Sequence, residues 1–133
     1  MMKNKDYLAY ALEALKNSYS PYSNYKVGAA VFLKNGKCVK GVNVENASYG
    51  LTNCAERTAL FTCYSLGYRK EDIEGIAIAS LSSVPASPCG ACRQVICELM
   101  NEDAFVIFGN DQDVINEMKV KDLLPSAFNK ELL

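Results

Sequence analysis

The segment 27–33 reads Val-Gly-Ala-Ala-Val-Phe-Leu and contains no polar side chain. A strand with one face in water alternates apolar and polar residues, so this run predicts a central strand that is covered on both faces. Asn35-Gly36 comes soon after it and is a strong signal for a two-residue hairpin turn. The segment 37–44 is therefore expected to return antiparallel to the first strand.

A first helix is indicated near the N-terminus by apolar residues at helical spacing, namely Leu8, Leu12, Leu15 and Tyr19. The segment 18–23 is expected to end this helix, because Pro21 lies in its middle. After the hairpin, helical and strand-like segments alternate. The expected elements are a helix over about 53–66, a strand around 76–79, a helix over about 90–100 and a strand over 104–108.

This alternation is typical of an α/β fold in which helices cross over between parallel strands. The turn 109–111 is too short for another crossover, so a last strand near 114–118 is expected to be antiparallel. We therefore predict an α/β fold, a three-layer α/β/α sandwich with a five-stranded mixed sheet. No repeat or linker-like stretch divides the 133 residues, so a single catalytic domain over 1–133 is expected.

Composition narrows the choice of partners. Fourteen basic and fifteen acidic residues give a net charge of −1, which argues against nucleic acid and favours a small substrate. We find no apolar run of signal-peptide length at the N-terminus and none long enough to span a bilayer, so a cytoplasmic protein with no membrane partner is expected. The six cysteines are then expected to be reduced, as ligands or small core residues.

Two short segments, 52–57 and 87–93, bring metal-binding residue types to two predicted helix starts. Cys54 lies in the first segment, and Cys89 and Cys92 lie in the second. The chain has no histidine, so it can hold zinc only through sulfur and oxygen. Three thiolates leave the fourth tetrahedral position for water, which is typical of catalytic zinc. Ligands in open α/β sheets gather at the carboxyl ends of parallel strands, so the two segments are expected to meet there.

A closed four-cysteine structural site is the main alternative, with Cys38, Cys63 or Cys97 as the fourth ligand. Spacing argues against each of them. Cys63 lies on the order of 13 Å along the helix from Cys54, Cys97 is more than a turn beyond Cys92, and Cys38 is beside the hairpin turn at the far end of its strand.

Glu56 and Arg57 follow Cys54 directly. Arg57 is three residues after Cys54, so its guanidinium is expected to donate to the sulfurs and to offset the net charge of −1 that three thiolates leave on Zn²⁺. Glu56 can reach a metal-bound water without binding the metal, and a carboxylate there would carry a proton. Each residue also has an ordinary interpretation, Arg57 as a solvated helix arginine and Glu56 as a favourable acid in a first helical turn.

The segments 54–56 and 88–92 resemble the signature of the zinc-dependent nucleobase deaminases. Further likeness lies in the segments 20–23, 27–30, 43–47, 53–60 and 123–128. Over nearly the full chain, the sequence is similar to the small homotetrameric cytidine deaminases. The resemblance implies hydrolytic deamination of cytidine and deoxycytidine in pyrimidine salvage, with one Zn²⁺ per subunit.

Carried onto this chain, the resemblance makes Cys54, Cys89 and Cys92 the zinc ligands. It implies that zinc-bound hydroxide attacks C4 of the pyrimidine while Glu56 protonates N3, after which ammonia leaves. Arg57 would then lie beside the ligands without binding the metal.

The resemblance also implies how the nucleoside is held. Asn43 and Glu45, on the segment that includes Val44, would bind the ribose hydroxyls, and the backbone N–H of Ala55 would meet the O2 carbonyl. From the residues alone, Asn43 and Glu45 would be loop residues at a strand end.

Tyr25 and Phe128 match aromatic positions of the family. Tyr25 stands at the pocket wall, where the family often has phenylalanine. Phe128 corresponds to an aromatic that reaches a neighbouring subunit's active site, so complete pockets would need the homotetramer. As a tail residue taken alone, Phe128 would pack locally.

Two other functions are compatible with the sequence. One is a related deaminase of another cytosine-bearing compound, such as blasticidin S, which shares the three-cysteine site. The other is a zinc-stabilised interaction module without activity, in which Glu56 and Arg57 would have no special purpose.

Overall fold

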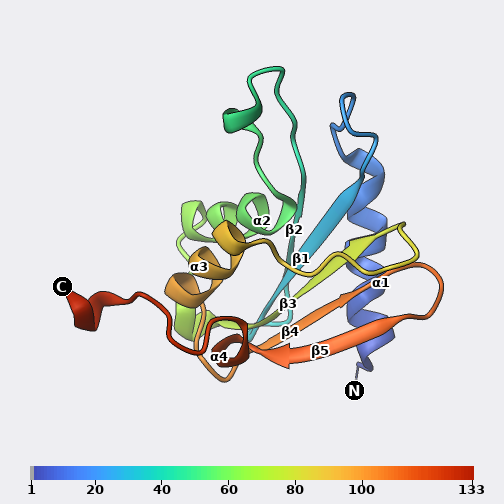
Figure 1. Cartoon of the computed structure of the whole chain (residues 1–133). Helices are drawn as coiled ribbons and strands as arrows, with labels where there is room; N and C mark the ends of the chain where they lie inside the picture. The colour runs from blue at the N-terminus through green and yellow to red at the C-terminus, as the bar shows by residue number, and fades with distance from the viewer. Residues whose placement is uncertain (1) are drawn as a thin grey trace.

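The computed structural model describes residues 2–133 and contains one sheet with the strand order β2-β1-β3-β4-β5 (Figure 1). The strands are β1 (Val27–Leu33), β2 (Cys38–Val42), β3 (Ile73–Ser80), β4 (Phe105–Gly109) and β5 (Ile115–Lys119). The α-helices are α1 (Asn4–Ala14), α2 (Ala55–Ser65), α3 (Gly90–Leu99) and the short α4 (Val120–Leu123). The predicted five-stranded α/β fold is confirmed.

Strand directions make the sheet mixed, as expected. β1 is antiparallel to both of its neighbours, β2 and β3, so these two strands run in the same direction. β3 and β4 are parallel, and β5 returns antiparallel to β4. The parallel strands β2, β3 and β4 therefore end at the same edge of the sheet.

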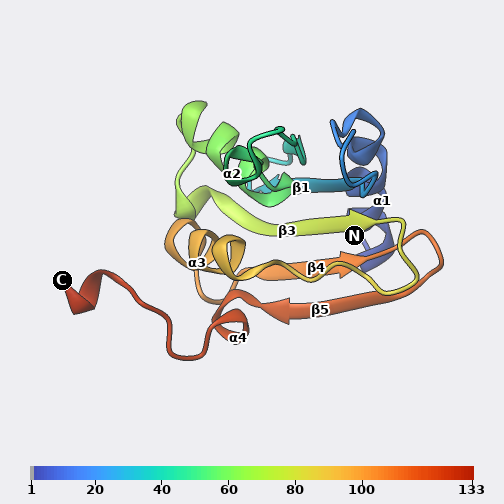
Figure 2. The same cartoon turned by 45° about the horizontal axis from the view of Figure 1, so that its top comes forward.

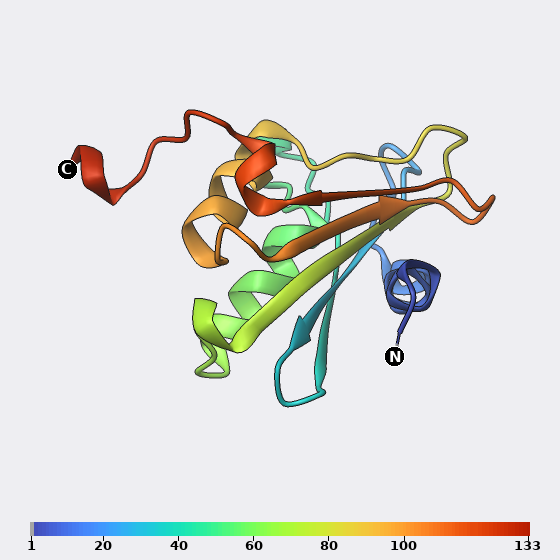
Figure 3. The same cartoon turned by 90° about the horizontal axis from the view of Figure 1, so that it is seen from below.

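Helices cover both faces of the sheet, which gives the predicted three layers (Figures 2 and 3). Side chains alternate along β1, so Ala29 and Val31 pack in the core on the α2 and α3 side, while Ala30 and Phe32 pack in the core that contains α1. These β1 side chains are 6% exposed or less, which confirms that the uniformly apolar run is a central strand.

The first helix ends at the segment 18–23, as predicted, but one residue assigned to its apolar face lies beyond that end. The α-helix ends at Ala14 and a 3-10 turn continues to Asn17, whereas Ser18 turns into extended backbone. Tyr19 is therefore not a helical core residue but pairs with Val44 in an isolated bridge and is 54% exposed. The assignment of Tyr19 to the apolar helical face was wrong, because the bridge replaces the helix.

The loops after β2 and β3 lead to the starts of α2 and α3. Val44 and Asn53 exchange backbone hydrogen bonds of 2.9 Å in both directions, which closes the loop between β2 and α2. The α3 helix follows β3 after the loop 81–89. Among residues 2–133, no helix is both long and apolar enough to cross a membrane.

Gly41 allows α2 to pack closely on β2, and its replacement tests this packing. A Cβ at Gly41 would lie 2.7 Å from the carbonyl oxygen of Ala55 and would also overlap the backbone nitrogen of Ala59. Because backbone cannot move aside cheaply, we expect Gly41→Ala to lower the free energy of unfolding by about 1–3 kcal/mol. Chemical denaturation measures this, with Gly50→Ala as the control because a Cβ at Gly50 meets nothing within 4 Å. Equal stabilities of the two variants would contradict the close packing.

Candidate metal centre and active site

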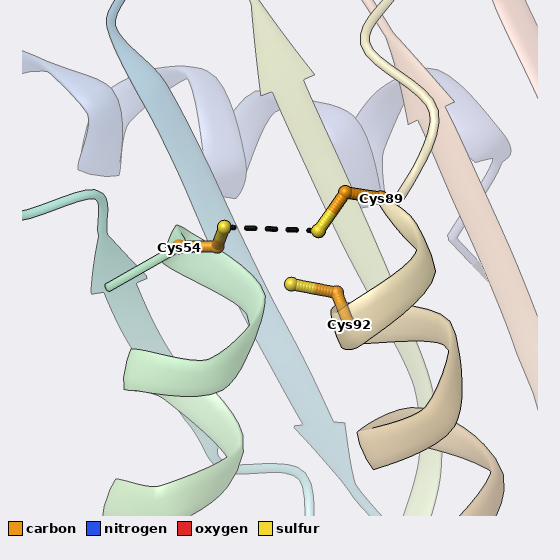
Figure 4. Close-up of side chains that lie close together, drawn as sticks. All are labelled: Cys54, Cys89 and Cys92. Carbon is orange, nitrogen blue, oxygen red and sulfur yellow. Dashed lines mark hydrogen bonds between the residues drawn. The ribbon is translucent and has the colours of Figure 1, made fainter. Parts of the chain in front are cut away.

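Three cysteine side chains converge where α2 and α3 begin (Figure 4). Cys54 is the N-cap residue of α2, and Cys89 is the N-cap residue of α3. Cys92 lies in the first turn of α3, and the three Sγ atoms are all within 4.8 Å of one another. The predicted meeting of the two segments is therefore present in the structure.

The spacing of the sulfurs suits a tetrahedral metal ion. The Sγ atoms of Cys54 and Cys89 are 3.9 Å apart. Two sulfurs bound at about 2.3 Å with tetrahedral angles would be about 3.8 Å apart. Three sulfurs at this spacing can hold one zinc ion and leave its fourth position open.

The other cysteines lie elsewhere, which argues against a closed four-cysteine site. Within residues 2–133, the metal-binding group consists of Cys54, Cys89 and Cys92. Cys63 lies on α2 and is fully buried in the core, and the Sγ of Cys97 lies 3.9 Å from the carbonyl oxygen of Val120. Cys38 packs against the core on the α1 side of the sheet.

The surroundings of Cys54 favour a thiolate. Hydrogen bonding from the Cys92 thiol and donation from Arg57 together lower the pKa of Cys54 to about 5, although burial opposes the shift. Nη2 of Arg57 lies 3.3 Å from the Cys54 sulfur, which is the contact that the sequence predicted. The hydrogen bond to Cys54 and burial raise the pKa of Cys92. The positive ends of two helices add to this preference for negative charge.

Glu56 lies beside the sulfurs but outside the three-sulfur group. Its side chain is 5% exposed, and burial raises the pKa of its carboxyl above the ordinary value, with a further contribution from the negative charge of Cys54. A carboxyl with a raised pKa changes its protonation state more readily near neutral pH, which is what a proton carrier requires.

A cavity of about 180 Å³ opens next to the cysteines and Glu56. Six predicted site residues line it, namely Tyr25, Asn43, Cys54, Ala55, Glu56 and Cys89. Its remaining lining residues are Val27, Thr52, Asn53, Ile78, Ala86 and Ser87. None of these six had a predicted role, although Thr52, Asn53 and Ser87 lie in the two cysteine-bearing segments. The position of Ile78 near the carboxyl end of β3 was also a usable signal.

Asn43 is fixed by the protein itself. Its side-chain oxygen accepts hydrogen bonds from the Val27 N–H at 3.0 Å and from the Ser18 hydroxyl, and its Nδ2 donates to the Tyr25 carbonyl at 2.7 Å. This carboxamide therefore holds the loop that carries Tyr25 against the start of β1. Because the NH₂ group has two hydrogens, one donor is left over for a ligand.

Three of the predicted substrate-binding residues, Val44, Glu45 and Phe128, do not line the cavity. Glu45 lies in an adjoining hollow of about 230 Å³, where it accepts hydrogen bonds from the backbone N–H groups of Tyr22 and Ser23. The Ser23 hydroxyl lowers the pKa of Glu45, which keeps the carboxylate charged. Val44 is 43% exposed, and Phe128 is 57% exposed on the C-terminal tail, which extends away from the sheet (Figure 1). The Phe128 carbonyl oxygen accepts a hydrogen bond of 2.9 Å from Gln94 on α3, and its side chain does not line the cavity of the single chain.

Comparison with protein families identifies the chain. Residues 1–108 match the model of the cytidine and deoxycytidylate deaminase zinc-binding region. The chain belongs to this deaminase family. The family is zinc-dependent, and the three-cysteine cluster gives this member a place for one zinc ion.

Relatives support the assignment over most of the chain. A cytidine deaminase of Halalkalibacterium halodurans is 52% identical over 121 residues, which are 91% of this chain and 90% of the relative. A cytidine deaminase of Sporosarcina psychrophila is 44% identical and covers 93% of this chain and 90% of its own length. The crystal structure of cytidine deaminase from Burkholderia pseudomallei superposes with a TM-score of 0.91 at 46% identity, covering 96% of this chain and 100% of that one.

Replacement of Cys89 tests the metal centre. We expect Cys89→Ser to bind zinc at least about tenfold more weakly, because a neutral hydroxyl replaces one of three thiolate ligands. Zinc content after dialysis against a graded series of chelator concentrations measures the loss. The matched control is Cys97→Ser on the same helix, which should retain one zinc ion. Equal zinc retention by both variants would contradict the assignment of Cys89 as a ligand.

Proposed function

We propose that this deaminase converts cytidine and deoxycytidine to uridine and deoxyuridine with release of ammonia, as a step of pyrimidine salvage. The observation that carries the proposal is the buried Glu56 carboxyl in the same cavity as Cys54 and Cys89. A structural zinc site needs no acid in a cavity beside it, whereas hydrolysis at a ring carbon needs a proton carrier.

We assign the zinc ligands to Cys54, Cys89 and Cys92. Bound there, zinc acts as a Lewis acid and lowers the pKa of water, which supplies the nucleophile for C4 of the pyrimidine. Arg57 donates to the Cys54 sulfur and offsets the negative charge that three thiolates place on the centre. By offsetting this charge, Arg57 helps to keep the pKa of the metal-bound water low, which the reaction requires.

Glu56 moves the protons in this proposal. It takes a proton from the attacking water and gives it to N3, which leaves C4 bonded to both a hydroxyl and the amino group. Glu56 then carries the proton of the C4 hydroxyl to the amino nitrogen. The C4–N bond breaks, the hydroxyl oxygen becomes the C4 carbonyl oxygen, and ammonia departs. The sum is one water consumed and one ammonia released for each nucleoside.

The start of α2 also orients the base. Ala55 is the first residue of the helix, so its backbone N–H has no acceptor within α2. We propose that this N–H donates a hydrogen bond to the O2 carbonyl of the pyrimidine. Tyr25 forms the cavity wall beside the ring.

We assign ribose binding to the segment 43–45. Asn43 lines the cavity and has one amide hydrogen left, while the Glu45 carboxylate lies in the adjoining hollow, which shares Thr52 with the cavity. Val44 joins them and is held by its bridge to Asn53. A nucleoside with its base at the sulfurs and its sugar toward Glu45 would use both hollows.

The Glu56→Gln variant tests the proton step. The amide keeps the shape of the side chain but cannot carry the proton, so we expect kcat for cytidine to fall by about 10² to 10⁴ while zinc content stays the same. The loss of ultraviolet absorbance on deamination measures turnover. Glu98→Gln, an exposed acid on α3, is the matched control and should behave as the unmodified enzyme.

Full activity of Glu56→Gln would contradict the proton assignment. Two further outcomes would contradict the proposed function itself. Turnover of blasticidin S but not of cytidine would indicate a related deaminase, and zinc binding without turnover of any cytosine compound would indicate an interaction module.

We propose further that the enzyme is a homotetramer in which Phe128 of one subunit completes the pocket of another. This is supported by the exposure of Phe128, Leu132 and Leu133, at 57%, 66% and 95%, on a tail that leaves the body of the subunit (Figure 2). Apolar side chains so placed would gain from burial against a second copy. A cytoplasmic location and free nucleosides as substrates, with no nucleic-acid or membrane partner, stay predictions from the sequence.

Mixed tetramers test the shared pocket. We expect Phe128→Ala to raise KM for cytidine about tenfold, because one aromatic contact is lost. Co-expression of Phe128→Ala with Glu56→Gln should then restore sites of normal KM, since one subunit supplies Glu56 and its neighbour supplies Phe128. If Phe128 served its own subunit, no mixed tetramer would regain normal KM. A fully active monomer in light scattering would also contradict the proposal.

A further inference from the structure

Asn110 is a fully buried polar residue directly after β4, and its side chain is 1% exposed. Its Nδ2 donates to the carbonyl oxygens of Ser82 at 2.9 Å and Ser83 at 3.2 Å. Its Oδ1 accepts from the N–H groups of Gln112 at 2.9 Å and Val114 at 3.2 Å. A carboxamide has two donor hydrogens and two acceptor positions, so the hydrogen-bonding capacity of Asn110 is fully used.

These four bonds serve two different segments. The two accepted bonds close the turn between β4 and β5, together with a backbone bond of 3.1 Å from Asn110 to Val114. The two donated bonds hold the loop 81–89, which leads from β3 to the ligand Cys89. Asn110 thus ties the loop before the metal centre to the neighbouring turn.

The loop 81–89 has little apolar anchoring at its outer end. Leu81 is 48% exposed and Val84 is 75% exposed, so burial of their side chains does not fix the backbone there. Where apolar contacts are few, the position of a loop depends on its hydrogen bonds. The bonds from Asn110 are therefore a principal restraint on this part of the loop.

The clamped part of the loop is connected to the walls of the cavity. The Ser82 hydroxyl lies 3.4 Å from the Tyr25 hydroxyl and 3.2 Å from the Ser80 hydroxyl. The Ser80 hydroxyl in turn accepts a bond of 3.2 Å from the N–H of Ala86. Tyr25 and Ala86 both line the cavity, so a displacement of Ser82 would also displace these two lining residues.

We propose that Asn110 is a positioning residue for the deamination. By holding the backbone at Ser82 and Ser83, it fixes Tyr25 and Ala86 at the distance that suits a nucleoside base. Asn110 is outside the cavity lining and acts through Ser82, without contact to substrate. This assignment rests on the proposed function, and it predicts an effect on substrate binding without loss of zinc.

The variant Asn110→Asp separates the two tasks of the residue. A carboxylate can still accept from Gln112 and Val114, so the turn keeps its bonds. It cannot donate to Ser82 and Ser83, and it places negative charge against their carbonyl oxygens. We expect KM for cytidine to rise about tenfold, with kcat changed less than about threefold and zinc content unchanged. The matched control is Asn101→Asp, because Asn101 is exposed and its Nδ2 donates to the Lys70 carbonyl, away from the cavity lining.

A second variant keeps the test decisive if Asn110→Asp does not fold. Ser82→Ala leaves the backbone carbonyl for Asn110 but removes the hydroxyl that joins Tyr25 and Ser80. We expect a smaller rise in KM from this change, and no additional rise when it is combined with Asn110→Asp, because both act through one connection. A normal KM in both single variants would overturn the proposal, as would equal effects of Asn110→Asp and Asn101→Asp.

Amide hydrogen exchange separates this proposal from the proposed function. Exchange over 82–86 should be faster in Asn110→Asp than in Asn101→Asp, whether or not the protein acts on cytidine. Faster exchange, together with an unmodified protein that does not deaminate cytidine, would mean that Asn110 does restrain the loop at Ser82 and Ser83 but that the proposed function is wrong. Unchanged exchange in this segment would contradict the restraint of the loop by Asn110.

Discussion

Two helix N-termini meet at one edge of the sheet because β2 and β3 run in the same direction on either side of β1. Each helix begins with a cysteine, so the chain needs no histidine to gather metal ligands. The unpaired backbone N–H groups and helix dipoles favour thiolates there. The cavity of about 180 Å³ opens beside the same edge, and the chemistry of the site therefore follows from strand direction.

Charge balance explains the residues around the sulfurs. Three thiolates would make a zinc ion a weak Lewis acid, and the Arg57 guanidinium at 3.3 Å from Cys54 offsets part of that charge. Glu56 follows in the same helical turn but is buried, so its carboxyl resists ionisation while that of Glu45 is held charged by hydrogen bonds. Two carboxyl groups in neighbouring hollows are thus suited to different tasks, one to proton transfer and the other to hydrogen bonding with a sugar.

Sequence patterns predicted the features that depend on residues close together in the chain, such as strands, turns and helix starts. The apolar run at β1, the Asn35-Gly36 turn and the cysteines at helix starts were sufficient to predict a central strand, its antiparallel partner and the meeting of the three cysteines. Tyr19 was wrongly assigned to the helix, because the helix ends before it and its backbone pairs with Val44, which is distant in sequence. The sequence predicts Asn110 only as part of a turn. Its hydrogen bonds to the loop before α3 depend on the tertiary fold and leave no signal in the sequence. The proposed role of Phe128 requires a second subunit, and residue spacing within one chain does not predict such a contact.

We propose that three cysteines hold one zinc ion and leave one coordination position for water. X-ray absorption spectroscopy at the zinc edge of the zinc-loaded protein measures this coordination directly. We expect three sulfur neighbours at about 2.3 Å and one oxygen neighbour at about 2.0 Å. Four sulfur neighbours and no oxygen would contradict it, because a closed site has no position for the water that deamination consumes.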